Sequence, residues 1–362
     1  MVLKCSLIAG IAGLTVLAAC VAPDKAEICA PSMSDLQAIG SHNSYKLAIP
    51  PNELALLQAQ ALEWAIALDY AHIPLQDQLD LGMRQIELDV FHDPDGGLFS
   101  DPLAPKLVGN SFDATDLEKP GFKVLHVQDV DPRSSCELFV QCLNEIKSWS
   151  EINPDHAPLL IMLNAKQAPI ELPGATVPLA FDGAAFDALD AEIRSVFSDE
   201  ALITPDDVRA NASTLRDAVL TNGWPNLAAA RGKVFFALDE GPDVVEVYRR
   251  GQTSLQGLVI FVNSSDVEAD DAAYFTLNDP IAQGEEISAR VRKGFMVRTR
   301  ADADTQEART GDNTRLNAAL TSGAQYISTD YYQPRLEWSD YAVQLPGGDV
   351  VRTNPLSRCT IQ

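Results

Sequence analysis

Two histidines and two acidic residues stand at positions where side chains of their types can do chemistry. His42 and His126 each lie at the end of a short apolar run, and between them Glu87 and Asp89 lie two residues apart in another such run. Histidine can take or give a proton at neutral pH, because its ordinary pKa is about 6.5. Residues two apart in a strand share one face, and two carboxylates on a buried face need a positive partner such as a hard divalent cation. The pattern predicts proton transfer beside a bound metal ion.

Each of these residues also has a purely structural interpretation. A histidine at a strand end is more often a hydrogen-bonding residue than a catalyst, and Glu87 and Asp89 could pair with Arg84 or another cation. A catalytic interpretation is favoured because the two histidines and the acidic pair all stand at the ends of three successive predicted strands. In a barrel of parallel strands, those ends meet at one mouth.

Eight short apolar segments are predicted to be strands, and the amphipathic segments between them to be helices. We expect strands at residues 36–42, 84–91, 123–127, 159–163, 233–238, 258–262, 295–299 and 325–329. We expect helices at residues 54–70, 136–151, 181–197, 213–220, 243–250 and 309–322. Such alternation predicts an α/β fold, a (β/α)8 TIM-type barrel in one domain, with a doubly wound sheet as the alternative. Residues 274–277 fit either a further strand or a loop.

The composition excludes some classes of partner. Acidic residues number 51 against 27 Lys and Arg, which gives a net charge of −24. A nucleic-acid binder needs a surplus of cations, so no nucleic-acid partner is expected. The same acidity discourages, without forbidding, tight docking to an anionic membrane. Any contact with a phosphate must be local, through a metal ion or a few cations, and we expect a monomer.

The N-terminal residues are predicted to be an export signal. Lys4 precedes an apolar run over residues 7–17, and the sequence from Leu17 to Cys20 resembles the lipobox of bacterial lipoproteins. We expect a signal peptide at 1–19, a lipid on Cys20, a tether at 20–35 and the folded domain at 36–362. The protein would then be anchored in the bacterial cell envelope, periplasmic or surface-facing. In the alternative, an ordinary secretory signal with Cys20 incidental, the protein is still exported.

Four cysteines remain beyond the predicted lipid site. An even number in an oxidising compartment predicts disulfides, and four cysteines allow three pairings. We favour a local bridge between Cys136 and Cys142 and a link between the chain ends from Cys29 to Cys359. The spacing lacks the paired C-x₂-C units that are typical of zinc sites.

Taken together, the candidate residues resemble a known family. The run from Ser41 to Tyr45, the pair Glu87 and Asp89, and the His126 segment resemble the phosphatidylinositol-specific phospholipase C-like phosphodiesterases, above all their bacterial calcium-dependent branch. The likeness extends over nearly the whole chain after the signal. Glycerophosphodiester phosphodiesterases share the barrel but carry His-Arg-Gly where this chain has His-Asn-Ser. The metal-independent bacterial phospholipases use an Arg in place of the metal, and the acidic pair argues against that.

The resemblance implies a site and a reaction. Asn43, Glu87 and Asp89 would hold Ca²⁺, with Mg²⁺ less favoured, and His42 and His126 would act on the phosphodiester. The expected reaction cleaves phosphatidylinositol-type lipids to diacylglycerol and a cyclic inositol phosphate. The sequence leaves open which histidine is the acid and which is the base, and whether a carboxylate is the base instead.

One position departs from the family pattern. Eukaryotic relatives place a glutamate ligand at the end of the fourth strand, where this chain has Asn164, which offers an amide oxygen without charge. We keep Asn164 as a metal ligand and expect Lys166 to contact phosphate.

Three further residues are candidate substrate contacts. Arg298 and Arg300 share a face near the end of the seventh expected strand and could bind phosphate or inositol, although pairing with Asp302 or Asp304 is the alternative. Asp330, at the end of the eighth, is expected to contact an inositol hydroxyl or to orient an arginine.

Two other functions stay open from the sequence. The first keeps the fold and the metal but acts on a soluble glycerophosphodiester or another phosphodiester, which the net charge of −24 suits better than a membrane lipid. The second is a non-catalytic lipoprotein that binds an inositol or sugar phosphate.

Overall fold

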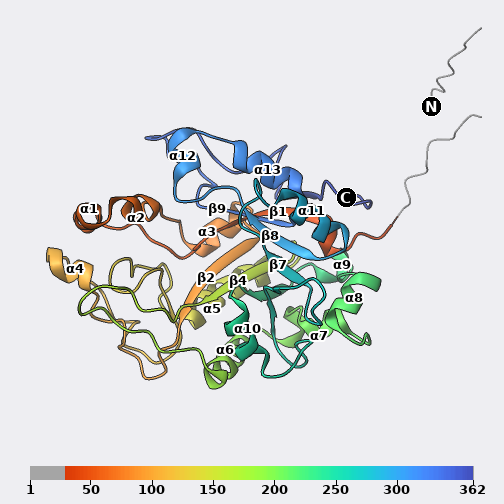
Figure 1. Ribbon diagram of the computed structural model, residues 1–362, viewed down its shortest axis with the longest axis horizontal. Coiled ribbons are helices and arrows are strands. Elements are labelled where there is room, and N and C mark those ends of the chain that lie inside the picture. The colour runs from red at the N-terminus through yellow and green to blue at the C-terminus, as the bar shows by residue number, and fades with distance from the viewer. Residues whose placement is uncertain (1–28, 362) are drawn as a thin grey trace, which may run out of the picture.

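The computed structural model describes residues 29–361, and in this part of the chain ten strands form two five-stranded sheets (Figure 1). The predicted signal segment and Cys20 lie outside the described residues. The strands are β1 (Leu36–Ser41), β2 (Gln85–Phe91), β3 (Lys123–Val124), β4 (Leu159–Ala165), β5 (Val234–Leu238), β6 (Ile260–Val262), β7 (Tyr274–Thr276), β8 (Met296–Arg300), β9 (Tyr326–Thr329) and β10 (Val351–Thr353). One sheet has the order β10-β1-β9-β8-β7 and the other β3-β2-β4-β5-β6.

The two sheets meet at two seams and together form a distorted (β/α)8 barrel. At one seam, β1 runs so close to β2 that a Cβ atom on Gly40 would lie 2.4 Å from the Cβ of Gln85, which only glycine avoids. The Arg84 amide donates to the Ile39 carbonyl across this seam at 2.8 Å. At the other, a single parallel bridge joins Asn263 to Tyr274. The expected barrel is confirmed, with incomplete hydrogen bonding between its halves.

The third expected strand is wrong in extent and direction. We predicted a parallel strand over residues 123–127, but β3 has two residues and pairs antiparallel with β2. The chain then turns, with a bridge between Val127 and Asp131 and a left-handed Asp129 at φ 69°. Val124 and Leu125 are both buried, which accounts for their apolar character, although only Val124 belongs to the ladder. The eighth parallel strand is instead β7, which pairs with β8.

Helices surround the strands on the outside (Figure 1). They are α1 (Pro51–Gln60), α2 (Leu62–Ala67), α3 (Leu75–Asp80), α4 (Leu103–Val108), α5 (Phe139–Ile152), α6 (Gly183–Val196), α7 (Pro205–Arg209), α8 (Leu215–Thr221), α9 (Leu227–Ala230), α10 (Pro242–Arg249), α11 (Gly284–Arg292), α12 (Gln306–Thr310) and α13 (Thr314–Ser322). Two expected helices are each divided, one at Ala61, which leaves helical geometry at φ −151°, and one at Gly311, which is left-handed at φ 68°.

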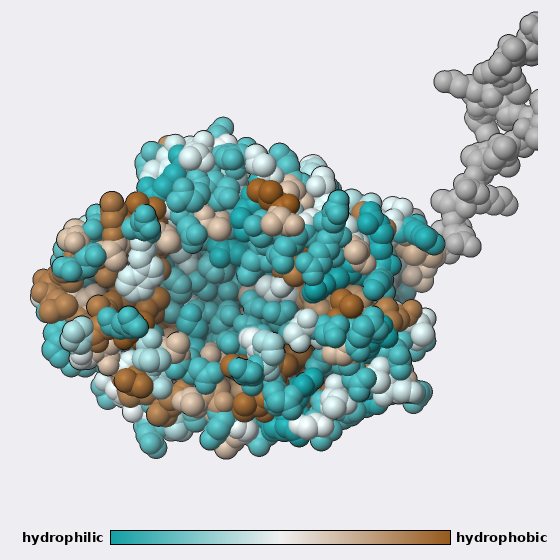
Figure 2. All heavy atoms as spheres, in the orientation of Figure 1, coloured by the Kyte–Doolittle hydropathy of each residue, from teal (hydrophilic) through white to brown (hydrophobic). Residues whose placement is uncertain are grey.

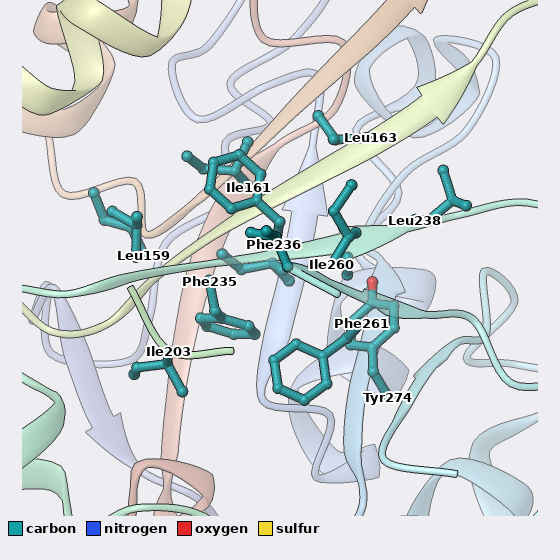
Figure 3. Packing of buried hydrophobic residues seen from close by; sticks show 14 of the residues in the cluster. Leu159, Ile161, Leu163, Ile203, Phe235, Phe236, Leu238, Ile260, Phe261 and Tyr274 are labelled. Carbon is teal, nitrogen blue, oxygen red and sulfur yellow. The ribbon is translucent and has the colours of Figure 1, made fainter. Parts of the chain in front are cut away.

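Aromatic side chains from neighbouring strands build much of the core. Phe235 and Phe236 of β5 lie beside Phe261 of β6 and Tyr274 of β7 (Figure 3). The rings of Phe235 and Phe261 meet edge to face, with their centres 6.2 Å apart. Burying one such side chain stabilises the fold by about 1.5–3 kcal/mol. This packing gives the strand ends a rigid base.

Both favoured disulfides are confirmed. Cys136 bonds to Cys142, and Cys29 bonds to Cys359 across a separation of 330 residues. The second bond joins the two ends of the described chain. No helix within residues 29–361 is both long enough and apolar enough to span a bilayer.

Candidate active site

His42 and Asn43 reach one site because β1 ends at Ser41. Neighbouring residues of a strand point to opposite faces, but Asn43 leaves the strand in a left-handed conformation with φ 47°. The loop is clamped to β2, since the Ser44 amide donates to the Glu87 carbonyl at 3.0 Å and the Ser44 hydroxyl accepts from the Glu87 amide at 2.8 Å. Both side chains are therefore held beside the carboxyl end of β2.

The neighbours of His42 hold its ring neutral. Nδ1 lies 2.8 Å from Asp330 Oδ1, and because a carboxylate only accepts, Nδ1 carries the proton. The lone pair of Nε2 then accepts from Arg300 Nη1 at 3.3 Å. Burial, followed by the charge of Arg300, lowers the pKa of His42 to about 3. Arg300 also donates to Asp330 at 3.2 Å, so Asp330 orients an arginine and a histidine at once.

His126 has a carboxylate partner of its own that sequence reasoning missed. Its Nδ1 lies 2.8 Å from Asp131 Oδ2, in the turn that follows. Lys46 Nζ lies 3.2 Å from the same oxygen, and both of these side chains are almost completely buried. Although burial opposes it, the charge of Lys46 lowers the pKa of Asp131. The ionised Asp131 fixes the ring, and Nε2 remains for proton exchange.

Tyr70 lies between the two histidines. Its ring centre is 6.0 Å from that of His42 and 6.1 Å from that of His126. Its hydroxyl accepts from Asn43 Nδ2 at 2.7 Å, so the amide oxygen of Asn43 points elsewhere. A cavity of about 310 Å³ opens beside Tyr70 and Asp330. The two imidazoles therefore lie near each other, one on either side of the Tyr70 ring.

His72 supports the β1 loop from behind. Its Nε2 lies 2.7 Å from the His42 carbonyl, which can only accept, so this nitrogen carries the proton. Nδ1 lies 3.3 Å from the Tyr332 hydroxyl, on which the ring also stacks. Burial lowers the pKa of His72 to about 4. A neutral His72 is thus part of the folded loop.

Acid should destabilise the fold through His72. The unfolded residue binds a proton below its ordinary pKa of 6.5, whereas the folded one does so only near 4, so its stabilisation is complete above 6.5 and is lost as the pH falls. At about pH 5.5 the loss is about 1.4 kcal/mol. Urea unfolding at about pH 7.5 and about pH 5.5 measures it. The difference between the two pH values should shrink in His72→Gln, and an unchanged difference would contradict this assignment.

Glu87 is held by side chains from three other strand ends. Its Oε2 accepts from Arg298 Nη2 at 2.6 Å, its Oε1 accepts from Asn164 Nδ2 at 3.2 Å, and His42 Nε2 lies 3.7 Å from Oε1. Burial raises the pKa of Glu87 to about 8 in spite of Arg298. Arg84, the structural partner that the sequence suggested, binds main-chain carbonyl groups instead.

Asp89 is paired with the lysine that we expected to contact phosphate. Asp89 on β2 is in register with Asn164 on β4, and Lys166 Nζ lies 3.2 Å from Asp89 Oδ2. That oxygen is buried and makes no hydrogen bond of good geometry. A carboxylate oxygen in this state is open to a further positive ligand.

These residues fit a hard divalent cation. Asn43, Glu87, Asp89 and Asn164 offer carboxylate and amide oxygens, which Ca²⁺ prefers, and Asp89 Oδ2 lacks a hydrogen-bond partner. Within residues 29–361, no three His, Cys, Asp or Glu side chains are gathered closely enough to hold a metal. A metal ion there would therefore depend on the two amides as well as the carboxylates, and on release of Asp89 from Lys166.

The structure brings the expected site residues together, through direct contacts or a shared neighbour. They are His42, Asn43, Glu87, Asp89, His126, Asn164, Lys166, Arg298, Arg300 and Asp330. Neither arginine pairs with Asp302, which accepts from the Asp330 amide instead. Sequence reasoning missed Tyr70, Asp131 and Asp239. Of these, Asp239 had a signal, because it directly follows an expected strand, and it accepts from Asn263 at 3.1 Å.

Solved structures share this fold. A calcium-dependent phosphoinositol-specific phospholipase C from a Gram-negative Pseudomonas species matches with a TM-score of 0.53 at 15% identity, covering 89% of this chain and 95% of that one. A Ca²⁺-dependent phosphatidylinositol-specific phospholipase C from Streptomyces antibioticus matches with a TM-score of 0.51 at 17% identity, covering 83% and 95%. At these identities the likeness concerns the fold. No curated protein matches the chain.

A family model decides the class. The model for Ca²⁺-dependent phosphoinositide phospholipase C matches residues 32–355, which is most of the chain and includes every strand of the barrel. The departure at Asn164 does not prevent this match. The chain therefore belongs to the Ca²⁺-dependent phosphoinositide phospholipase C family and is a calcium-dependent phosphoric diester hydrolase.

Proposed function

We propose that this enzyme cleaves phosphatidylinositol-type lipids, releasing diacylglycerol and a cyclic inositol phosphate that can then be hydrolysed. The observation that carries the proposal is the pair of imidazoles, each backed by a buried carboxylate and both packed against Tyr70. Displacement at phosphorus by an inositol hydroxyl needs one group to take a proton and another to give one. The two imidazoles beside Tyr70 supply both groups.

His42 is the base in this proposal. Asp330 keeps the proton on Nδ1, so Nε2 carries the lone pair that can accept the hydroxyl proton. In the free enzyme Arg300 beside Nε2 disfavours the imidazolium. A phosphodiester bound to Arg300 would offset that charge and make His42 a stronger base. Arg300 would thereby couple phosphate binding to proton removal.

His126 is the acid. Asp131 holds the proton on Nδ1 and stabilises the doubly protonated ring. Nε2 can then protonate the diacylglycerol oxygen as its bond to phosphorus breaks. Lys46 balances the charge of Asp131, which would otherwise be a costly buried carboxylate.

Calcium would be held by Asn43, Glu87, Asp89 and Asn164. When bound, the ion would stabilise negative charge on the phosphoryl oxygens and lower the pKa of the attacking hydroxyl. Arg298 is only 1% exposed and is bonded to Glu87 and Asn278, so it serves to hold Glu87 rather than to reach the substrate.

A lipid substrate suits the surface of the enzyme. Figure 2 shows a hydrophilic hollow near the middle of one face, with apolar side chains over α1, α2 and α4 at its left. Exposed apolar residues there include Leu62 and Trp64 on α2 and Leu107 on α4. Asn52 on α1 is hydrogen-bonded to Asn110, which lies two residues after the end of α4. Polar and apolar surfaces side by side match a headgroup and its acyl chains.

Export and anchoring are part of the proposal. Two disulfides are typical of an oxidising compartment, and the N-terminal sequence up to Cys20 has the pattern of a lipoprotein signal. We propose a lipid-anchored protein of the cell envelope that acts as a monomer. The net charge of −24 would give the protein little electrostatic attraction to its target membrane.

The same charge supports the second candidate, a soluble glycerophosphodiester. Hydrolysis assays of the full-length protein on phosphatidylinositol vesicles and on glycerophosphoinositol separate the two. We expect cyclic inositol phosphate from the vesicles in Ca²⁺ and none after chelation. Turnover of glycerophosphoinositol alone would move the function to the soluble substrate, and Ca²⁺ binding without turnover of either would refute both.

A further inference from the structure

Each carboxylate of the calcium site is paired with a cation of this chain, but the two cations differ. Arg298 lies 2.6 Å from Glu87 and is bonded to Asn278 as well, within the barrel. Its side chain is 1% exposed. Lys166 makes its ion pair with Asp89 from the surface, with 36% of its side chain exposed. Arg298 is therefore enclosed with its carboxylate, whereas Lys166 borders solvent.

The main chain of Lys166 is fixed while its ammonium is not. The Lys166 amide donates to the Val90 carbonyl at 2.8 Å, which places the side chain beside Asp89 on the neighbouring strand. The ammonium meets an Asp89 oxygen that no hydrogen bond of good geometry holds.

A second polar space lies next to this pair. A cavity of about 570 Å³ is lined by Lys166 together with Asn164, Asp239 and Glu240. The Glu240 carboxylate accepts a hydrogen bond from the amide of Ala165, the residue before Lys166, at 2.7 Å. An ammonium that left Asp89 would thus meet other carboxylates rather than an apolar surface.

We propose that Lys166 is a displaceable counter-ion of the calcium site, which neutralises Asp89 in the metal-free enzyme and gives way when Ca²⁺ binds. The inference rests on the proposed calcium ligands and adds a competitor among this chain's own residues. Lys166 keeps a buried carboxylate compensated while no ion is present, and it makes the site bind Ca²⁺ more weakly than its oxygens alone would.

The test is the variant Lys166→Met, which keeps the length of the side chain and removes its charge. Calorimetric titration of the chelator-treated full chain with CaCl₂ should give an affinity about fivefold to tenfold higher than that of the parent. The melting temperature in chelator should fall, because Asp89 is then uncompensated. Lys166→Arg should keep an affinity near the parent value. Lys147→Met removes a partly exposed lysine paired with Glu151 on α5 and should change neither quantity.

The outcomes separate this inference from the proposed function. If the parent binds Ca²⁺ and Lys166→Met binds it equally or more weakly, the counter-ion role is wrong while the calcium site stands. That result would return Lys166 to the phosphate contact expected from the sequence. If neither the parent nor the variant binds Ca²⁺, both proposals fail. Binding by the variant alone would support the inference in its strongest form.

Discussion

Replacing His126 with alanine should lower kcat on phosphatidylinositol by about 10²- to 10⁴-fold, while the affinity for Ca²⁺ stays within about twofold of the parent. The reason is that Nε2 of His126 gives its proton to the leaving oxygen, whereas none of the proposed metal ligands touches this ring. The hydrogen-bond partner of the ring is Asp131, which lies in the turn after β3. Steady-state hydrolysis and calorimetric Ca²⁺ titration of the same preparation measure the two quantities.

A substrate with a better leaving group sharpens this test. A nitrophenyl ester of inositol phosphate needs no protonation as it leaves, so His126→Ala should lose far less activity on it than on the lipid. His42→Ala should lose activity on both, because the attacking hydroxyl is the same. His92→Asn is the matched control, since His92 stacks on Phe122 and contacts neither catalytic ring in the structure. Equal losses of His126→Ala on the two substrates would refute its role as the acid.

Replacing Asp89 with asparagine should weaken Ca²⁺ binding by on the order of 100-fold and lower activity at limiting Ca²⁺ by a similar factor. The change keeps the shape of the side chain but removes the charge of an oxygen that no well-aligned hydrogen bond satisfies. Raising the Ca²⁺ concentration should restore part of the activity, because a weakened site can still be filled. Activity measured across a Ca²⁺ titration shows both effects.

Asp95→Asn provides the comparison for this variant. Asp95 is exposed in the turn after β2, and its replacement removes the same charge without touching the site. Its Ca²⁺ affinity and activity should match the parent. If Asp89→Asn bound Ca²⁺ as tightly as the parent, Asp89 would have to be removed from the ligand set.

The residues that the sequence predicted best are those fixed by local periodicity. Glu87 and Asp89 follow from their spacing in a strand, and that strand was found almost to the residue. The turn at Asn43 resolved a conflict that the sequence alone posed, since His42 and Asn43 would diverge in a continued strand. The bounds of a buried strand are visible in the sequence, because burial on both faces requires apolar residues along its length.

The partners of these residues were not visible, because they come from distant parts of the chain. Asp330 meets His42 across 288 residues and Arg298 meets Glu87 across 211, and no local pattern reports such pairs. Asp131 was missed for another reason. The segment around His126 was predicted as a strand, in which a residue five positions on would lie far away, whereas the observed turn brings it back to the ring.

The bond between Cys29 and Cys359 has a consequence for how the enzyme would work on a cell. β1 starts beside β10, near that bond, and runs about 20 Å to the loop of His42, so the bond and the catalytic ring lie at opposite ends of the barrel. If Cys20 carries a lipid, the stretch from Cys20 to Cys29 reaches at most about 30 Å. A short tether at the end of the barrel that holds the Cys29–Cys359 bond would then direct the catalytic end away from the anchoring membrane. The active site would face the membrane of a neighbouring cell.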